Sequence, residues 1–361
     1  MAVRVVACMT LVCAYAACQS EPVSAAARLT LTPYPVDQGF VVAPTFLDLG
    51  SLQSFVIDRL KRSIEIEKFC EDLDQKFEKL GWERRPCNGI HFETALRSNR
   101  GYPLVYAVFG SGGNRTMLIS GVHPDELTPL PMGFRFAKYL AEHPEKYASS
   151  DQTIIIVPLV NPDGFFVEKP TRTNAQGVDL NRNFFTADWY SSAHALWEQN
   201  RKRDRRYFPG HVPNSEVETF FQEQLLSKFQ PNKILSIHAP LGFLDYDGPA
   251  DGKPESKDRH VKSAREWVQA ISRSTKNYRI VDYSFYPGSL GNYGGNERNI
   301  PTVTLELQST NPRKVDEYWQ SFLPGLIEAT SYSVPVERLS SKTVVTGPLI
   351  GQIQSAAAAL E

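Results

Sequence analysis

Two short apolar runs, each ending in a histidine, constrain the fold of this chain more than any other feature. Met117 to Val122 leads into His123-Pro-Asp-Glu126, and Ile234 to Ile237 ends at His238. Apolar runs of this length, bounded by polar residues, are typical of buried strands. In open α/β sheets, ligands bind outside the carboxyl ends of the strands. We therefore expect both histidines to lie at one edge of a mainly parallel sheet.

The residue types at these strand ends suit a catalytic metal. Two imidazoles and one carboxylate, here His123, His238 and Glu126, form a three-ligand set that leaves the fourth position of zinc open. An open position is what a hydrolase needs in order to activate water. A His-x-x-Glu motif is weak by itself, because a chain of this length can carry one by chance.

Apolar periodicity predicts an alternation of strands and helices through most of the chain. Strands are expected over 104–109, 115–122, 153–160, 233–238, 278–283 and 302–307, and helices over 129–142, 215–229, 258–275 and 312–331. Ser215 and Glu218 have the spacing of a capping box at the start of the second helix. Such alternation predicts a three-layer α/β domain, which we place at residues 89–335.

A long polar string between two of these strands makes the interpretation more specific. Asn161-Pro-Asp-Gly164 has the composition of a turn, and it leads to Arg172-Thr-Asn-Ala-Gln-Gly-Val-Asp-Leu-Asn-Arg-Asn-Phe184. This string resembles the zinc carboxypeptidase superfamily and, within it, the bacterial murein peptide amidases that trim peptidoglycan peptides. The resemblance covers residues 89–333 and continues at 214–219, 236–241, 286–291 and 304–306. It implies a mixed, mainly parallel central sheet.

The resemblance also implies a role for each of several residues. It implies one zinc ion per chain, with His123, Glu126 and His238 as ligands. The remaining roles are the catalytic glutamate (Glu306), the arginine that polarises the scissile carbonyl (Arg172), the pair that binds the substrate's free carboxylate (Asn181 and Arg182), the carboxylate behind the first zinc histidine (Asp179) and the mobile tyrosine (Tyr286).

The chemistry of Glu306 can be argued without the resemblance. It ends the apolar segment 301–307, where an isolated charge would be costly unless a metal or its water lay nearby. A carboxylate there can take the proton of water and deliver it to the leaving amine. The alternative readings are a surface salt bridge for Glu306, a structural ion pair for Arg182 and a turn cap for Asp179.

The substrate is constrained less closely than the reaction. The resemblance implies hydrolysis of the amide bond between γ-D-glutamate and diaminopimelate in peptidoglycan peptides. Ala239 stands where the murein amidases have an acidic residue, and Leu307-Gln308 stands where they have Phe-Pro. We expect these positions to line the substrate pocket. The alternatives are a metallocarboxypeptidase acting on C-terminal residues of other peptides, an N-acyl amino acid amidohydrolase, and an inactive relative that only binds peptides or cell wall.

Charge excludes one class of partner. The formal net charge of the 361 residues is −1, which argues against a general binder of polyanions such as nucleic acid. One basic run, Arg201-Lys-Arg-Asp-Arg-Arg206, is short and contains an aspartate. We interpret it as a solvated loop near the site.

The first residues have the pattern of a signal segment, which we place at 1–18. Arg4 precedes an apolar stretch from Val5 to Ala17 that is too short to span a bilayer. Cys18 resembles a lipoprotein cleavage site, with cleavage after Ala17 or near Ala27 as the alternatives. We therefore expect export to the periplasm or cell envelope, with a lipid at Cys18 as the one contact with membrane.

Residues 19–88 form an extension that contains a long helix, expected from Leu52 to Leu80. Apolar residues recur on one face at spacings of three to five, namely Val56, Leu60, Ile64, Phe69, Leu73, Phe77 and Leu80. The helix either packs on the catalytic domain for stability or serves as a lid or a partner-binding arm. Cys70 and Cys87 form a disulfide or remain buried thiols. The tail at 336–361 ends in residues typical of a vector scar.

Overall fold

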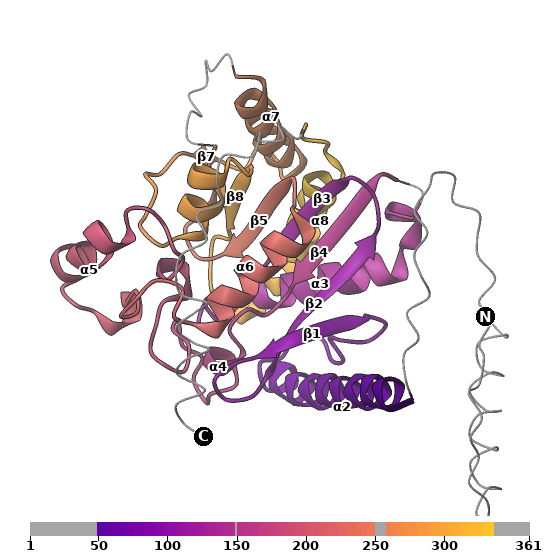
Figure 1. Ribbon diagram of the computed structural model, residues 1–361. Helices are drawn as coiled ribbons and strands as arrows, with labels where there is room; N and C mark the ends of the chain where they lie inside the picture. Colours follow the sequence, from indigo (N-terminus) through magenta and orange to yellow (C-terminus); the bar gives the residue numbers. More distant parts are fainter. Residues whose placement is uncertain (1–48, 149, 250–257, 336–361) are drawn as a thin grey trace, which may run out of the picture. The chain divides into compact units, whose positions relative to one another are not determined.

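The computed structural model describes residues 49–148, 150–249 and 258–335, and it divides the chain into two units, residues 1–52 and 53–361 (Figure 1). The predicted signal segment at 1–18, the lipid site at Cys18 and the tail at 336–361 lie outside the described residues. The description below concerns the second unit. Its long helix begins at Leu49, so the first turn of that helix belongs to the first unit. Among the described residues, no helix has both the length and the apolar character needed to cross a membrane.

A mixed sheet of eight strands forms the centre of the described part of the chain. Its order is β1-β2-β4-β3-β5-β8-β6-β7. The neighbours β4, β3, β5 and β8 are parallel, whereas β1–β2, β2–β4 and β6–β8 pair antiparallel. The strands are β1 (Phe92–Arg97), β2 (Pro103–Gly110), β3 (Asn114–Ile119), β4 (Gln152–Val157), β5 (Lys233–His238), β6 (Phe243–Tyr246), β7 (Ile280–Val281) and β8 (Thr302–Glu306).

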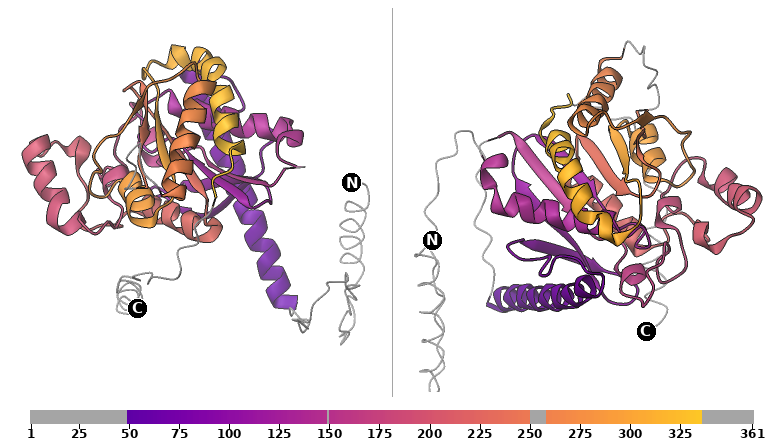
Figure 2. Two further views of the ribbon diagram at one scale, coloured as in Figure 1. Left: turned by 90° about the horizontal axis from the view of Figure 1, so that it is seen from above. Right: turned by 180° about the vertical axis from the view of Figure 1, so that it is seen from behind.

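Helices cover both faces of this sheet, as Figures 1 and 2 show. Alternate side chains of the parallel strands point to opposite faces, so Leu118 and Ile156 belong to one core cluster and Met117 and Ile155 to another. The first cluster includes side chains of α2 (Leu49–Lys79), α3 (Pro129–Glu142), α7 (Arg259–Ser274) and α8 (Val315–Ser331), and the second includes those of α6 (Val217–Phe229). The predicted three-layer α/β architecture is therefore confirmed.

The long helix α2 starts and ends close to the predicted residues, but only part of its apolar stripe is covered. Phe69, Leu73 and Phe77 are buried in the same core as α3 and the sheet. Leu60 and Ile64 lie on earlier turns and are 59% and 63% exposed. Burial of the second half thus joins the helix to the catalytic part of the chain.

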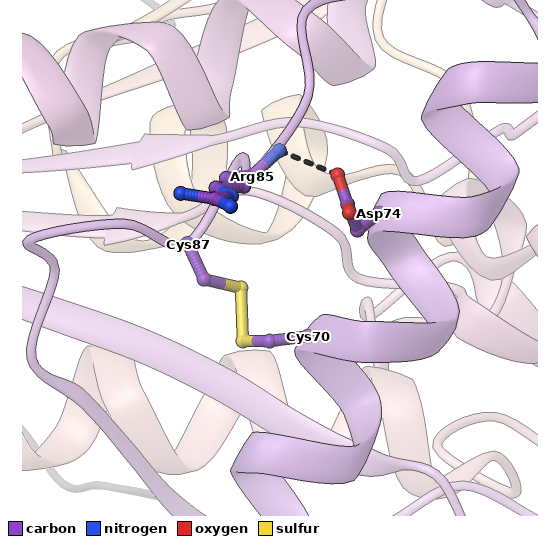
Figure 3. The surroundings of a disulfide bond; sticks show 4 residues. All are labelled: Cys70, Asp74, Arg85 and Cys87. Carbon is purple, nitrogen blue, oxygen red and sulfur yellow. Dashed lines mark hydrogen bonds between the residues drawn. A yellow bond between two sulfur atoms is a disulfide. The ribbon is translucent and has the colours of Figure 1, made fainter.

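A disulfide links the second half of α2 to the segment that follows the helix (Figure 3). Cys70 and Cys87 are bonded, with their Cα atoms 5.9 Å apart. The backbone N–H of Arg85 also donates to Oδ1 of Asp74, at 2.5 Å, within the same segment. Of the two alternatives for this pair of cysteines, the disulfide is the one that the structure contains.

Short elements account for most of the differences from the prediction. The predicted strand at 278–283 is reduced to β7, and both β1 and β6 are additional. The predicted capping box is wrong, because α6 begins at Val217 with Glu216 as its N-cap residue and without a side-chain cap. Instead, the Ser215 hydroxyl contacts the side chains of Glu216 and Asn183.

Candidate active site

The carboxyl ends of three parallel strands bring the predicted metal ligands and Glu306 together. His238 and Glu306 are the last residues of β5 and β8 and are paired in register. β3 is the other neighbour of β5 and ends at Ile119, four residues before His123. Between them, Gly121 adopts a φ of +64°, and a Cβ there would lie 3.0–3.1 Å from the side chains of Leu159 and Leu130. The turn that carries His123 therefore favours glycine at this point.

His123, Glu126 and His238 form a compact group of ligand atoms. Nδ1 of His123 lies 3.0 Å from Oε1 of Glu126, and Nδ1 of His238 lies 2.9 Å from Oε2. All three side chains are buried, and their ligand atoms lie within 4.8 Å of one another. Burial raises the pKa of Glu126, but the two histidines lower it by a larger amount, so the carboxylate is held ionised. Two imidazole nitrogens and an ionised carboxylate are a donor set that fits catalytic zinc.

The outer nitrogens of both histidines are also held in place. Nε2 of His123 lies 2.9 Å from Oδ1 of Asp179, and Nε2 of His238 lies 3.0 Å from Oγ of Ser236. Such partners set the ring orientation and the tautomer of a metal ligand. Asp179 matches the prediction in position, whereas Ser236 has no ligand-like spacing that would have identified it. Asp179 also caps the next turn by accepting from the backbone N–H of Asn181 at 3.1 Å.

Arg172 lies directly behind the ligand group. Its Nη1 donates to Oε1 of Glu126 at 2.9 Å, and its Nε donates to Oδ2 of Asp179 at 2.8 Å. Burial lowers the pKa of Arg172, but the charges of Asp179 and Glu126 outweigh this effect and raise it. The guanidinium is therefore a fixed positive charge whose Nη2 has no hydrogen-bond partner among the described residues.

Glu306 is half-buried beside the ligand group. The backbone N–H of Leu241 donates to its Oε2 at 3.3 Å. Burial, together with the negative charge of Glu126, raises the pKa of Glu306 to about 7, although His238 acts in the opposite direction. Of the two interpretations of Glu306, this environment favours a proton-transfer group over a surface salt bridge, because among the described residues no lysine or arginine forms an ion pair with it.

Asn181 and Arg182 lie on the turn that follows Asp179, and Tyr286 packs against this turn from a distant segment of the chain. Cζ of Arg182 is 3.9 Å from the centre of the Tyr286 ring, and its Nη1 donates to the backbone O of Asn181 at 2.5 Å. Oδ1 of Asn181 accepts from the backbone N–H of Leu290 at 2.8 Å, so its Nδ2 is left to donate elsewhere. Among the described residues, Arg182 forms no ion pair, which argues against a structural ion pair as its role.

The basic run at 201–206 lies next to the ligand group, as part of a lobe that stands away from the sheet in Figures 1 and 2. The lobe contains a π-helical turn (Trp189–Ala193), α5 (His194–Arg201) and a 3₁₀ turn (Arg205–Tyr207). Arg206 forms an ion pair with Asp125, which lies between the ligands His123 and Glu126. The expected loop is thus partly helical, and it is tied to the metal-binding segment.

Two positions that were expected to line the substrate pocket do not line it. Ala239 is only 2% exposed and Leu307 is fully buried, and both belong to the hydrophobic core. Gln308 is exposed beyond the end of β8. Because β8 alternates its faces, Leu307 points away from the face that carries Glu306. The difference from the murein amidases at 239 and 307 therefore affects packing behind the site.

A buried His-Glu-His group, a neighbouring glutamate and two arginines lie at the carboxyl edge of a mixed sheet, and only one of the arginines, Arg172, forms an ion pair within the described residues. This combination is that of a single-metal hydrolase. Residues 83–324 match the model of the zinc carboxypeptidase family, so the chain belongs to that family and is a zinc metallopeptidase.

Comparison with individual proteins adds detail. The chain is 30% identical over 175 residues to murein peptide amidase A of Escherichia coli K12, an alignment that covers 48% of this chain and 65% of that protein. It is 29% identical over 216 residues to the protein of the same name from Vibrio campbellii, covering 58% and 77%. Its fold is similar to that of bovine thrombin-activatable fibrinolysis inhibitor, with a TM-score of 0.54 and 19% identity over 74% of this chain and 95% of that one.

Proposed function

We propose that this protein hydrolyses the amide bond between γ-D-glutamate and diaminopimelate in peptidoglycan peptides. The observation that carries the proposal is the placement of Arg182, without a carboxylate partner among the described residues, near a His-Glu-His group and Glu306. Such an arginine suits a substrate that has a free carboxylate next to the bond to be cut. The similarity to the two murein peptide amidases supports the choice of peptide.

In this proposal His123, Glu126 and His238 hold zinc, which when bound supplies the Lewis-acid chemistry that activates water and polarises the carbonyl. Glu306 takes the proton of the attacking water and passes it to the leaving amine. Burial raises the pKa of Glu306, which makes this carboxylate a better proton acceptor than an exposed glutamate.

Arg172 stabilises the negative charge that develops on the carbonyl oxygen. Its Nε and Nη1 are occupied by Asp179 and Glu126, which fix the plane of the guanidinium. Nη2 is then the donor that remains for the substrate, and it needs no reorganisation at the moment of reaction. Asp179 therefore has two tasks, since it orients both His123 and Arg172.

Asn181 and Arg182 bind the free carboxylate of the leaving residue. Tyr286 lies against the Arg182 guanidinium, and the N–H groups that do not bind the backbone O of Asn181 remain to donate to the carboxylate oxygens. The hydrogen bond from Leu290 fixes the Asn181 amide so that Nδ2 can donate beside it. Tyr286 acts in this arrangement as the support of the arginine.

The test is incubation of the zinc-loaded protein with L-Ala-γ-D-Glu-meso-diaminopimelate, with products identified by mass spectrometry and a chelator control. Release of diaminopimelate that the chelator abolishes is the expected result. If only ordinary C-terminal residues or N-acyl amino acids are released from a parallel panel, the substrate assignment is wrong and one of those alternatives replaces it. Absence of all cleavage by zinc-bound protein would favour a binding protein.

We also propose that the protein acts outside the cytoplasm, in the periplasm or cell envelope. The signal-like pattern at 1–18 and the disulfide between Cys70 and Cys87 support this location, since disulfides persist in oxidising compartments. Fractionation of cells that express the full chain tests the proposal. Recovery in the cytoplasmic fraction with both thiols reduced would contradict it.

A further inference from the structure

Three arginines pack around the ring of Tyr207 beside the active site. The guanidinium carbons of Arg201, Arg172 and Arg206 lie 4.4, 5.2 and 5.9 Å from the ring centre. An aromatic face attracts a guanidinium and leaves its N–H edge available for hydrogen bonds. Because Arg172 also contacts Glu126, this cluster links the end of α5 to the metal-binding segment.

The charges of the cluster are not balanced. Arg206 is paired with Asp125, and Arg172 is paired with Glu126 and Asp179. The side chain of Arg201, by contrast, is exposed and forms no hydrogen bond or ion pair in the part of the chain that the structure describes. Arg182 also forms no ion pair there, so two arginines near the ligand group are left to bind an anion.

Arg201 lies close to Arg172, since both pack on the ring of Tyr207. Its distance from the Arg172 guanidinium cannot exceed the sum of their two distances to the Tyr207 ring, 4.4 Å and 5.2 Å. Burial lowers the pKa of Arg182, the charge of Asp179 raises it, and the positive charges of Arg172 and Arg201 lower it again, which places Arg201 within electrostatic range of Arg182.

The turn after α5 fixes this position. The backbone N–H of Lys202 donates to the carbonyl of Trp197 at the end of the helix, and Lys202 and Arg203 both adopt positive φ. Nε1 of Trp197 then donates to the backbone O of Asp204 at 2.7 Å. Arg201 is therefore the last residue of α5 before the chain turns back, and Tyr207 holds its guanidinium.

We propose that Arg201, supported by Tyr207, binds a second carboxylate of the substrate, namely the α-carboxylate of the γ-linked glutamate. This inference rests on the proposed function and adds a specificity residue to it. A γ-linked glutamate keeps its α-carboxylate free, roughly 5 Å from the scissile carbonyl carbon when extended. An ordinary α-linked residue without an acidic side chain has no carboxylate at that distance. Arg201 would thus select γ-linked peptides on the acyl side of the bond.

The far carboxylate of diaminopimelate is a second source of the same chemistry. It belongs to the leaving residue and would reach Arg201 only from the side of Arg182. The position of Arg201 beside Arg172, which faces the scissile carbonyl in the proposed mechanism, favours the glutamate carboxylate instead.

The test compares kcat/KM for three tripeptides on zinc-loaded wild type and Arg201→Gln. The first is L-Ala-γ-D-Glu-meso-diaminopimelate, the second carries an α-carboxamide on the glutamate, and the third has L-lysine as its last residue. We expect wild type to prefer the first over the second by roughly tenfold or more, the scale of one charge-assisted hydrogen bond. Arg201→Gln should reduce that preference to about onefold without altering the ratio of the first to the third.

Arg203→Gln is the matched control, because Arg203 lies on the same lobe but pairs with Glu198, and it should keep the wild-type preference. A preference that survives in Arg201→Gln, or that is absent in wild type, overturns the inference while the peptidase function stands. If Arg201→Gln loses only the preference for the diaminopimelate peptide over the lysine peptide, Arg201 binds the far carboxylate of the leaving residue. That result overturns the assignment to the glutamate carboxylate. Cleavage of none of the three by wild type overturns the proposed function, and this inference with it. Thermal melting curves of both variants show whether the lobe remains folded.

Discussion

The Nε2 atom of His123 lies 2.9 Å from Oδ1 of Asp179, while the other oxygen of the same carboxylate accepts from Arg172. One side chain thus orients a proposed metal ligand and a proposed oxyanion donor. Burial raises the pKa of Asp179, but Arg172 and His123 lower that pKa by a larger amount, so Asp179 stays ionised in this role. The metal site and the carbonyl-binding site are therefore coupled through a single carboxylate.

Asp179→Asn should weaken zinc binding by about 10–100-fold, because an amide supports His123 less well than a carboxylate does. Competition with a chromophoric chelator measures the affinity directly. The matched control is Ser236→Ala behind His238, where loss of a neutral partner should cost less. Equal zinc affinity in Asp179→Asn and wild type would rule out this role for Asp179.

Glu306→Gln should lower kcat by at least about 100-fold while zinc remains bound, since the amide cannot accept the proton of water. Gln keeps the size of the side chain and can still accept from the N–H of Leu241. Metal content by atomic absorption and kcat on the tripeptide are measured on the same preparation. Wild-type activity in zinc-bound Glu306→Gln would eliminate the proposed proton transfer.

The disulfide between Cys70 and Cys87 should stabilise the fold by about 3 kcal/mol, the amount expected for a loop of their 17-residue separation. Urea unfolding of the Cys70→Ser, Cys87→Ser protein against wild type measures the difference. Reduction of wild type should produce the same loss and should leave the double variant unchanged. A modified thiol at either position in unreduced, unfolded protein would contradict the bond.

The residues that were correctly placed from sequence are those whose signal is local. β5 and α3 have the predicted bounds, because a continuous apolar run and a helical period are each visible within a few residues. His123, His238 and Glu306 follow from them, since strand ends in a parallel sheet share one edge. Asp179 and Arg172 lie in the segment 172–184, whose sequence by itself resembles the zinc carboxypeptidase superfamily.

The residues that were missed depend on contacts between distant segments. β6 has four residues and is defined mainly by its pairing with β8, about sixty residues later, which no local pattern reveals. Tyr207 and Arg201 lie beside the active site through contacts between distant segments, such as the ion pair of Arg206 with Asp125. The expectation for Leu307 failed because the resemblance compares residue types and does not show which face of β8 each one occupies.

Lys233 should make the free energy of unfolding depend on pH between neutral and alkaline values. It is fully buried on β5, with Nζ donating to Oδ1 of Asn114 at 2.5 Å, and burial lowers its pKa to about 7. Between pH 7 and its ordinary value of 10.5, the unfolded chain holds a proton that the folded protein has released. The free energy of unfolding therefore rises with pH through this window.

Lys233→Met should remove that rise. The stability difference between variant and wild type should change by about 2–4 kcal/mol from pH 7 to pH 10, in favour of wild type at the higher pH. Urea unfolding at several pH values measures it, with the exposed Lys262→Met as control. Parallel pH profiles for Lys233→Met and wild type would show that the lysine remains charged in the fold.

The two halves of α2 should respond differently to the same substitution. Leu73 is fully buried among Phe69, Phe77 and the core of the catalytic part, so Leu73→Ala should reduce the free energy of unfolding by about 2–5 kcal/mol. Leu60 lies on the same apolar stripe but is 59% exposed, and Leu60→Ala should change stability by less than about 0.5 kcal/mol. Urea unfolding of both variants tests the contrast. A loss at Leu60 as large as that at Leu73 would mean that the first half of the helix is covered in solution, and gel filtration of the wild-type protein would then show whether a second copy covers it.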